Sequence, residues 1–133
     1  MTPLDDKMLV GGQIRPDAIP ALADYGVTSI VNNRPDHEEP GQPLSAEIEA
    51  AAQAAGLEYR HIPVAGGMSP LQVEAMAAVL GSAKGKIFAF CKSGTRSTWL
   101  WALAEASRGE DSGTLIGKAA AAGFDIEPLR PYL

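Results

Sequence analysis

Segments with the composition of β-strands alternate with helical segments along the chain. The strand candidates are short and apolar or β-branched, and they cover Met8–Val10, Val27–Asn32, Leu57–Val64 and Lys86–Phe90. Strands separated by helices predict a mainly parallel sheet with helices on both faces, joined by right-handed crossovers. We therefore expect a three-layer α/β fold, formed by residues 1–133 as a single domain.

The helical segments carry their own start and stop signals. Ser69-Pro70-Leu71-Gln72 is a capping box with proline at the first helical position, and it predicts a helix that runs to about Leu80. The other predicted helices are Asp17–Tyr25 with Gly26 as its stop, an alanine-rich helix capped by Ser45 and ended by Gly56, and two helices near Arg96–Ser107 and Ser112–Ala122.

The only cysteine of the chain, Cys91, comes directly after the last predicted strand. Alone, a free cysteine is most often a small buried hydrophobic residue. Here a loop of four residues follows it, with a glycine that lets the backbone approach an anion, then Arg96 with a two-pronged donor, then the Ser97 hydroxyl. We predict a catalytic thiolate at Cys91, assisted by Arg96 and Ser97, inside an anion-binding loop formed by Lys92, Ser93, Gly94 and Thr95.

A second polar loop follows the strand that ends at Asn32. It spans Asn33–Pro43 and holds several prolines, which is typical of a surface turn. A functional interpretation is also open, because ligands of parallel sheets bind beyond the carboxyl ends of the strands. In that interpretation Asn33 and Arg34 are auxiliary site residues, with Arg34 a second anion contact. Asp36 is then a substitute proton donor or the group that orients Arg34.

Composition narrows the classes of function. The net charge of −5 gives no basic patch for nucleic acid. One cysteine cannot form an internal disulfide, so an oxidising compartment would not stabilise the fold. Acidic residues occupy Met1–Lys7, where a secretion signal would be apolar. No apolar run reaches the ~18 residues that span a bilayer. We therefore expect a cytoplasmic protein that does not bind membranes. His37, His61 and one cysteine make no metal set at useful spacing, so we expect neither metal nor cofactor.

The chain resembles a known family over most of its length. The matching motifs are Gly11-Gly12-Gln13-Ile14, Ile30-Val31-Asn32-Asn33-Arg34-Pro35-Asp36, Cys91-Lys92-Ser93-Gly94-Thr95-Arg96-Ser97 and Leu129-Arg130-Pro131. They resemble the phosphatase-like domain of the beta-lactamase hydrolase-like proteins. That resemblance implies a fold of the protein tyrosine and dual-specificity phosphatases, and as partner a persulfide dioxygenase or a sulfide:quinone oxidoreductase.

The reaction is open to three interpretations. Phosphatases of this superfamily place five residues between cysteine and arginine, whereas four separate Cys91 from Arg96, as in rhodanese-like loops. The segment Ile62–Met68, where a phosphatase would carry its general acid, holds no acid. We therefore favour rhodanese-like transfer of sulfane sulfur from a small anionic or persulfide substrate through Cys91. The alternatives are a phosphomonoesterase that forms a cysteinyl-phosphate, and a non-catalytic thiol sensor or docking module.

Overall fold

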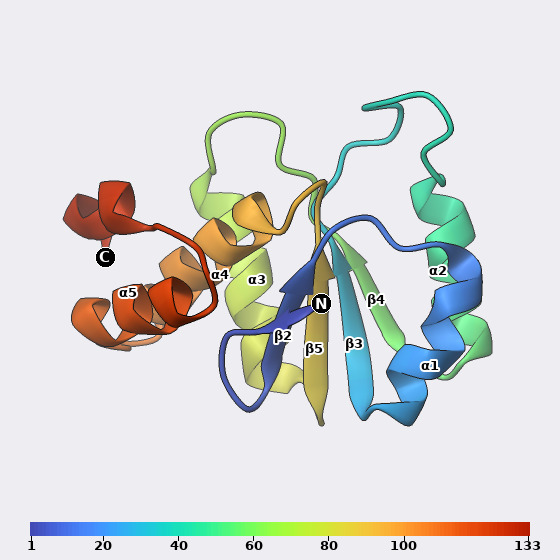
Figure 1. Cartoon of the computed structure of the whole chain (residues 1–133), viewed down its shortest axis with the longest axis horizontal. Helices are drawn as coiled ribbons and strands as arrows, with labels where there is room; N and C mark the ends of the chain where they lie inside the picture. Colours follow the sequence, from blue (N-terminus) through green and yellow to red (C-terminus); the bar gives the residue numbers. More distant parts are fainter.

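The computed structural model describes residues 1–133 and has a five-stranded sheet between two layers of helices (Figure 1). The strands are β1 (Thr2–Pro3), β2 (Met8–Gly11), β3 (Val27–Asn32), β4 (Glu58–His61) and β5 (Lys86–Phe90), in the order β1-β2-β5-β3-β4. All neighbouring pairs are parallel except β1 with β2, so the mainly parallel sheet is confirmed. Two-residue β1 was not expected, because so short a strand leaves no alternating pattern.

The helices are η1 (Pro16–Ala18, 3₁₀), α1 (Ile19–Asp24), α2 (Ser45–Ala54), α3 (Pro70–Ser82), α4 (Thr95–Ser107), α5 (Ser112–Ala121) and η2 (Glu127–Tyr132, 3₁₀). The predicted capping box is confirmed: the Gln72 amide N–H donates to Ser69 Oγ, and the Ser69 N–H donates to Gln72 Oε1. The predicted helix at Asp17–Tyr25 instead begins as the 3₁₀ turn η1, and the terminal η2 was not predicted.

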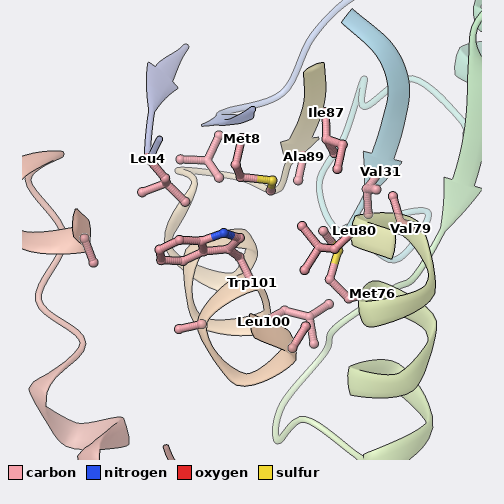
Figure 2. Close-up of a cluster of buried hydrophobic side chains, with 14 of the residues drawn as sticks. Leu4, Met8, Val31, Met76, Val79, Leu80, Ile87, Ala89, Leu100 and Trp101 are labelled. Carbon is pink, nitrogen blue, oxygen red and sulfur yellow. The ribbon is translucent and has the colours of Figure 1, made fainter. Parts of the chain in front are cut away.

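Two hydrophobic cores lie on opposite faces of the sheet. On one face α3, α4, α5 and η2 pack around Trp101, which is buried with Leu100, Met76 and Leu80 (Figure 2). On the other face α1 and α2 cover a smaller core around Phe88, and the rings of Phe88 and Phe90 lie 6.0 Å apart. Because both faces are covered, the central strand β5 is apolar and buried from Ile87 to Phe90, as is typical of a parallel sheet.

The carboxyl ends of the parallel strands meet at the upper edge of the sheet in Figure 1. Three connections converge there: the loop after β5, the loop between β3 and α2, and the loop between β4 and α3. Strand β4 stops at His61, three residues short of the predicted Val64, and Pro63 lacks the N–H that a further ladder bond would need. No helix is long and apolar enough to cross a membrane.

Candidate active site

The loop after β5 curls around the sulfur of Cys91. Cys91 lies directly beyond the last residue of β5, and its thiol is 1% exposed. The Gly94 backbone N–H points back to it, with the nitrogen 3.1 Å from Sγ. Gly94 has φ +92° and is the N-cap of α4, so the left-handed turn that a side chain would strain also aims the positive end of the helix dipole at the sulfur.

Hydrogen bonding stabilises the charged form of this thiol. Burial by itself raises the pKa of Cys91, but hydrogen bonds from the backbone N–H groups of Ser97, Ser93 and Gly94 and from the Ser97 hydroxyl outweigh it and lower the pKa. The thiolate is the nucleophilic form of cysteine. Of the four residues predicted to make an anion-binding loop, Ser93 and Gly94 donate backbone N–H groups to this sulfur, while the Lys92 ammonium lies 3.6 Å from a Glu39 carboxylate oxygen and the Thr95 hydroxyl 3.3 Å from that of Ser93.

Ser97 connects the thiol to the neighbouring strand loop. Its Oγ donates to Asn33 Oδ1 at 2.8 Å, and the Asn33 side-chain amide donates to the Ile62 carbonyl at 2.8 Å. Ser97 and Asn33 are both buried, so these bonds satisfy polar groups that water cannot reach. A hydroxyl hydrogen can rotate, so Ser97 can donate to Asn33 when the sulfur is protonated and to the sulfur when it is a thiolate.

Arg96 is held at the mouth of the loop by Glu38. Its Nη1 donates to Glu38 Oε2 at 2.7 Å and its Nη2 to Glu38 Oε1 at 2.8 Å. Nη1 also donates to the Val64 carbonyl at 2.7 Å. The hydrogen bonds from Arg96, joined by those from Arg34, lower the pKa of Glu38 to about 2 although partial burial opposes them. Glu38 is therefore a carboxylate at neutral pH and fixes the guanidinium.

Arg34 lies beneath this ion pair and is 1% exposed. Its Nε donates to Glu38 at 2.9 Å and its Nη1 to Gln13 Oε1 at 3.0 Å, while Nη2 is 3.0 Å from a Glu39 carboxylate oxygen. All three nitrogens therefore face protein oxygens. Arg34 therefore links the loop after β3 to Gln13, and its predicted role as a second anion contact stays a prediction.

Asp36 also has a structural contact. Its Oδ1 accepts from the Ser45 backbone N–H at 2.7 Å, so it serves the first turn of α2. The Ser45 cap predicted from the sequence is wrong: Leu44 is the N-cap residue, and the Ser45 hydroxyl instead lies 2.6 Å from the Tyr59 hydroxyl. The groups that contact Arg34 are Glu38, Glu39 and Gln13, so no contact supports the orienting role expected for Asp36, and its role as proton donor stays a prediction.

Gly12 brings a further strand end against the loop. A Cβ at this position would lie 2.9 Å from the Lys92 carbonyl oxygen, closer than real Cβ contacts. The neighbouring Gly11 carbonyl accepts from the Cys91 N–H at 3.2 Å. The Gly11-Gly12 pair therefore permits β2 and the cysteine loop to pack backbone against backbone, which is why this motif belongs to the site.

The sequence interpretation missed Glu38. It was assigned no role from the sequence, although it lies four residues after Arg34 and pairs with it. The segment between the two residues is a turn and not a helix, so their spacing gives no signal in the sequence. The bond to Arg96 could not have been anticipated, because 58 residues separate the two side chains.

Fold and site together define the class of this protein: a phosphatase-like α/β domain with a cysteine–arginine loop at the carboxyl edge of its sheet. The family described as beta-lactamase hydrolase-like protein, phosphatase-like domain, matches residues 1–108, and the chain belongs to it. A beta-lactamase hydrolase-like protein of Agrobacterium fabrum is 39% identical over 107 residues, which are 80% of this chain. The matched region is 25% of that relative, so this chain spans about a quarter of its length.

Solved structures agree on the fold. A candidate phosphatase from Neisseria meningitidis superposes with a TM-score of 0.81 at 31% identity, covering 98% of this chain and 93% of that one. The active form of Tk-PTP superposes with a TM-score of 0.72 at 17% identity, covering 98% and 90%. The protein tyrosine phosphatase-like fold implied by the resemblance is thereby confirmed.

Proposed function

We propose that this domain is a thiol-dependent sulfurtransferase in which Cys91 accepts sulfane sulfur and passes it to a second thiol. The observation that carries this proposal is a thiol whose ionised form is stabilised while no proton donor stands beside it. The backbone groups around Cys91 lower its pKa, and Glu38, the acid that binds Arg96, has a pKa of about 2.

The half-reaction balances without an acid. The Cys91 thiolate attacks the outer sulfur of a donor such as thiosulfate, a new S–S bond forms at Cys91, and the donor's own S–S bond breaks. Sulfite leaves with the electron pair, and Cys91 becomes a persulfide anion. The leaving group is stable as an anion, so no proton transfer is needed. The amides of the loop stabilise the persulfide charge, and Arg96 binds the oxygens of the donor.

A second candidate function is phosphate ester hydrolysis through a cysteinyl-phosphate, and the phosphatase-like fold supports it. Departure of an alkoxide from phosphate needs a general acid, typically worth about 10²–10⁴-fold. The segment Ala65–Met68 supplies none, Glu38 is ionised at neutral pH, and the Asp36 carboxylate serves α2. We therefore expect any esterase activity to be slow and confined to aryl phosphates, whose leaving groups need little protonation.

The discriminating experiment compares both reactions on one preparation. Turnover of thiosulfate with cyanide or a small thiol as acceptor is measured beside hydrolysis of an aryl and an alkyl phosphate, in the parent, in Cys91→Ser and in Asp36→Asn. We expect sulfur turnover in the parent and in Asp36→Asn, and none in Cys91→Ser. Efficient alkyl phosphate hydrolysis without sulfur turnover would reject the proposal, and its loss in Asp36→Asn would identify Asp36 as the general acid.

The acceptor is part of the same proposal. In the longer relatives, sequence beyond this domain accounts for about three quarters of the chain. A persulfide formed at Cys91 must be consumed by a thiol or by a persulfide-oxidising enzyme such as a persulfide dioxygenase, whereas a sulfide:quinone oxidoreductase would supply the sulfane sulfur. Loaded protein mixed with a persulfide dioxygenase and oxygen should lose its extra sulfur faster than loaded protein alone, which a mass measurement over time would test.

A further inference from the structure

An apolar groove lies beside the candidate active site. Its volume is about 780 Å³, and it runs between α3, α4, η2 and the loop that precedes α3. Its apolar lining includes Met68, Val73, Trp99, Leu103, Leu129 and Tyr132, and Glu74 is the one charged side chain on its wall. Small-molecule sites in proteins have volumes of about 300–1,000 Å³ and mostly apolar walls.

Helix α4 joins this groove to the cysteine loop. Arg96 lies in its first turn, and Trp99 and Leu103 follow three and seven residues later, which places all three on one face of the helix. With a rise of about 1.5 Å per residue, the part of α4 that lines the groove, from Trp99 to Ser107, extends about 12 Å along the helix axis. An anionic head bound at Arg96 would therefore have its body directed onto an apolar floor.

The loop between β4 and α3 contacts both regions. The Val64 carbonyl accepts from Arg96, and Gly66, Gly67 and Met68 form part of the groove wall. Neither glycine is required by crowding, because a Cβ at Gly66 or Gly67 would meet nothing within 4 Å, and neither has a positive φ. The wall can therefore adapt its shape at two positions where the fold does not demand glycine.

We propose that the groove binds the apolar body of the substrate, so that the substrate of Cys91 is an amphipathic anion with a sulfane-sulfur head and a hydrocarbon tail. Only the sulfane-sulfur head group of this inference rests on the proposed function, and the binding of an apolar tail in the groove does not. An alkanethiosulfonate, R–SO₂–S⁻, represents the class. The Cys91 thiolate attacks its terminal sulfur, the S–S bond of the donor breaks, and the alkanesulfinate R–SO₂⁻ leaves with the electron pair.

Binding of unreactive analogues tests the groove without any chemistry. The affinities of octanesulfonate and methanesulfonate are measured by titration calorimetry on the full chain. Each fully buried methylene is worth about fourfold in affinity, so partial burial of the octyl chain should give a preference of at least about tenfold over methanesulfonate. The affinity ratio should fall about tenfold in Leu103→Gln and in Met68→Gln.

Leu71→Gln is the matched control, since Leu71 is 75% exposed on α3 and does not line the groove. In Leu71→Gln the ratio of the affinities for octanesulfonate and methanesulfonate should equal the parental ratio. Equal affinities for the two sulfonates, or a preference that survives both groove variants, would overturn the proposal. So would a dimer in the parent that Leu103→Gln dissociates, because a second copy would then cover the groove.

Reaction with octanethiosulfonate separates this inference from the proposed function. If octanesulfonate binds with the expected preference and octanethiosulfonate loads Cys91 with sulfur, the groove proposal and sulfur transfer both stand. If octanesulfonate binds with that preference but neither octanethiosulfonate nor thiosulfate loads Cys91, the groove proposal stands and sulfur transfer fails. If thiosulfate loads Cys91 and octanesulfonate shows no preference, sulfur transfer stands and the groove proposal fails.

Discussion

Glu38 and Arg96 form a two-pronged ion pair, with Oε2 2.7 Å from Nη1 and Oε1 2.8 Å from Nη2. The same Glu38 Oε1 accepts from the buried Arg34, so one carboxylate joins the loop after β3 to the loop after β5. The Nε of Arg96 donates to no protein oxygen. Glu38 therefore positions the guanidinium and leaves one of its edges for an anion.

Glu38→Gln should slow sulfur transfer by about tenfold and destabilise the fold by about 1–3 kcal/mol, because Arg34 loses a charged partner in a buried position. Glu105→Gln is the matched control, since it alters a surface ion pair with Arg108 and should change stability by less than about 1 kcal/mol. The measurements are the turnover rate and the free energy of unfolding in urea. Equal losses in the two variants would contradict a positioning role for Glu38.

The stability that the Glu38–Arg96 ion pair contributes should decrease at low pH. The pKa of Glu38 is lowered from 4.5 to about 2 in the folded protein, chiefly by Arg96, so the folded state binds this proton more weakly than the unfolded state. The stabilisation is fully present above pH 4.5 and is lost as pH falls toward 2. The stability difference between the parent and Glu38→Gln should therefore shrink over that interval. A difference that stayed constant would show that Glu38 does not stabilise through its charge.

Arg96→Lys should lower sulfur transfer by about 10²-fold or more, although the charge is kept. Arg96 donates to both oxygens of Glu38 and to the Val64 carbonyl, and an ammonium group has no planar fork to match these contacts. Arg108→Lys, near the other end of the same helix, should retain the parental rate. Full activity in Arg96→Lys would mean that Arg96 acts only as a positive charge.

Gly12→Ala should raise the pKa of Cys91. The new Cβ would press on the Lys92 carbonyl at 2.9 Å and displace the loop whose N–H groups stabilise the thiolate. The rate of alkylation by iodoacetamide against pH reports this pKa, which should lie below 9.0 in the parent and higher in the variant. Gly117→Ala, where nothing lies within 4 Å of the added Cβ, should leave the profile unchanged. An unchanged profile in Gly12→Ala as well would contradict the packing argument.

Local signals in the sequence predicted the sheet and its loops well. Segments such as Lys86–Phe90 and Ser69–Gln72 carry their own signals, and the fold follows from their order along the chain. The cysteine loop was recognisable for the same reason, because Cys91 and Arg96 are five positions apart. Each of these features lies within a few residues of sequence.

Features that depend on contacts distant in sequence were missed. Glu38 and Arg96 meet only because β3 and β5 are neighbours in the sheet, and Gly12 is needed only because its strand end packs against Lys92. The burial of Arg34 could not be predicted either, because an arginine is seldom buried without several acceptors, and the sequence does not show which acceptors lie near it. Such contacts follow from the tertiary arrangement and leave no local pattern.

The proposed function requires that Cys91 carries sulfane sulfur as a persulfide. Intact-mass analysis after incubation with thiosulfate or polysulfide measures this sulfur, with Cys91→Ser as the control. We expect a gain equal to one sulfur atom in the parent, lost on treatment with a small thiol and absent from Cys91→Ser. A parent mass that stays unchanged under conditions in which iodoacetamide alkylates Cys91 would show a reactive thiol that does not accept sulfur, and sulfur transfer through Cys91 would be rejected.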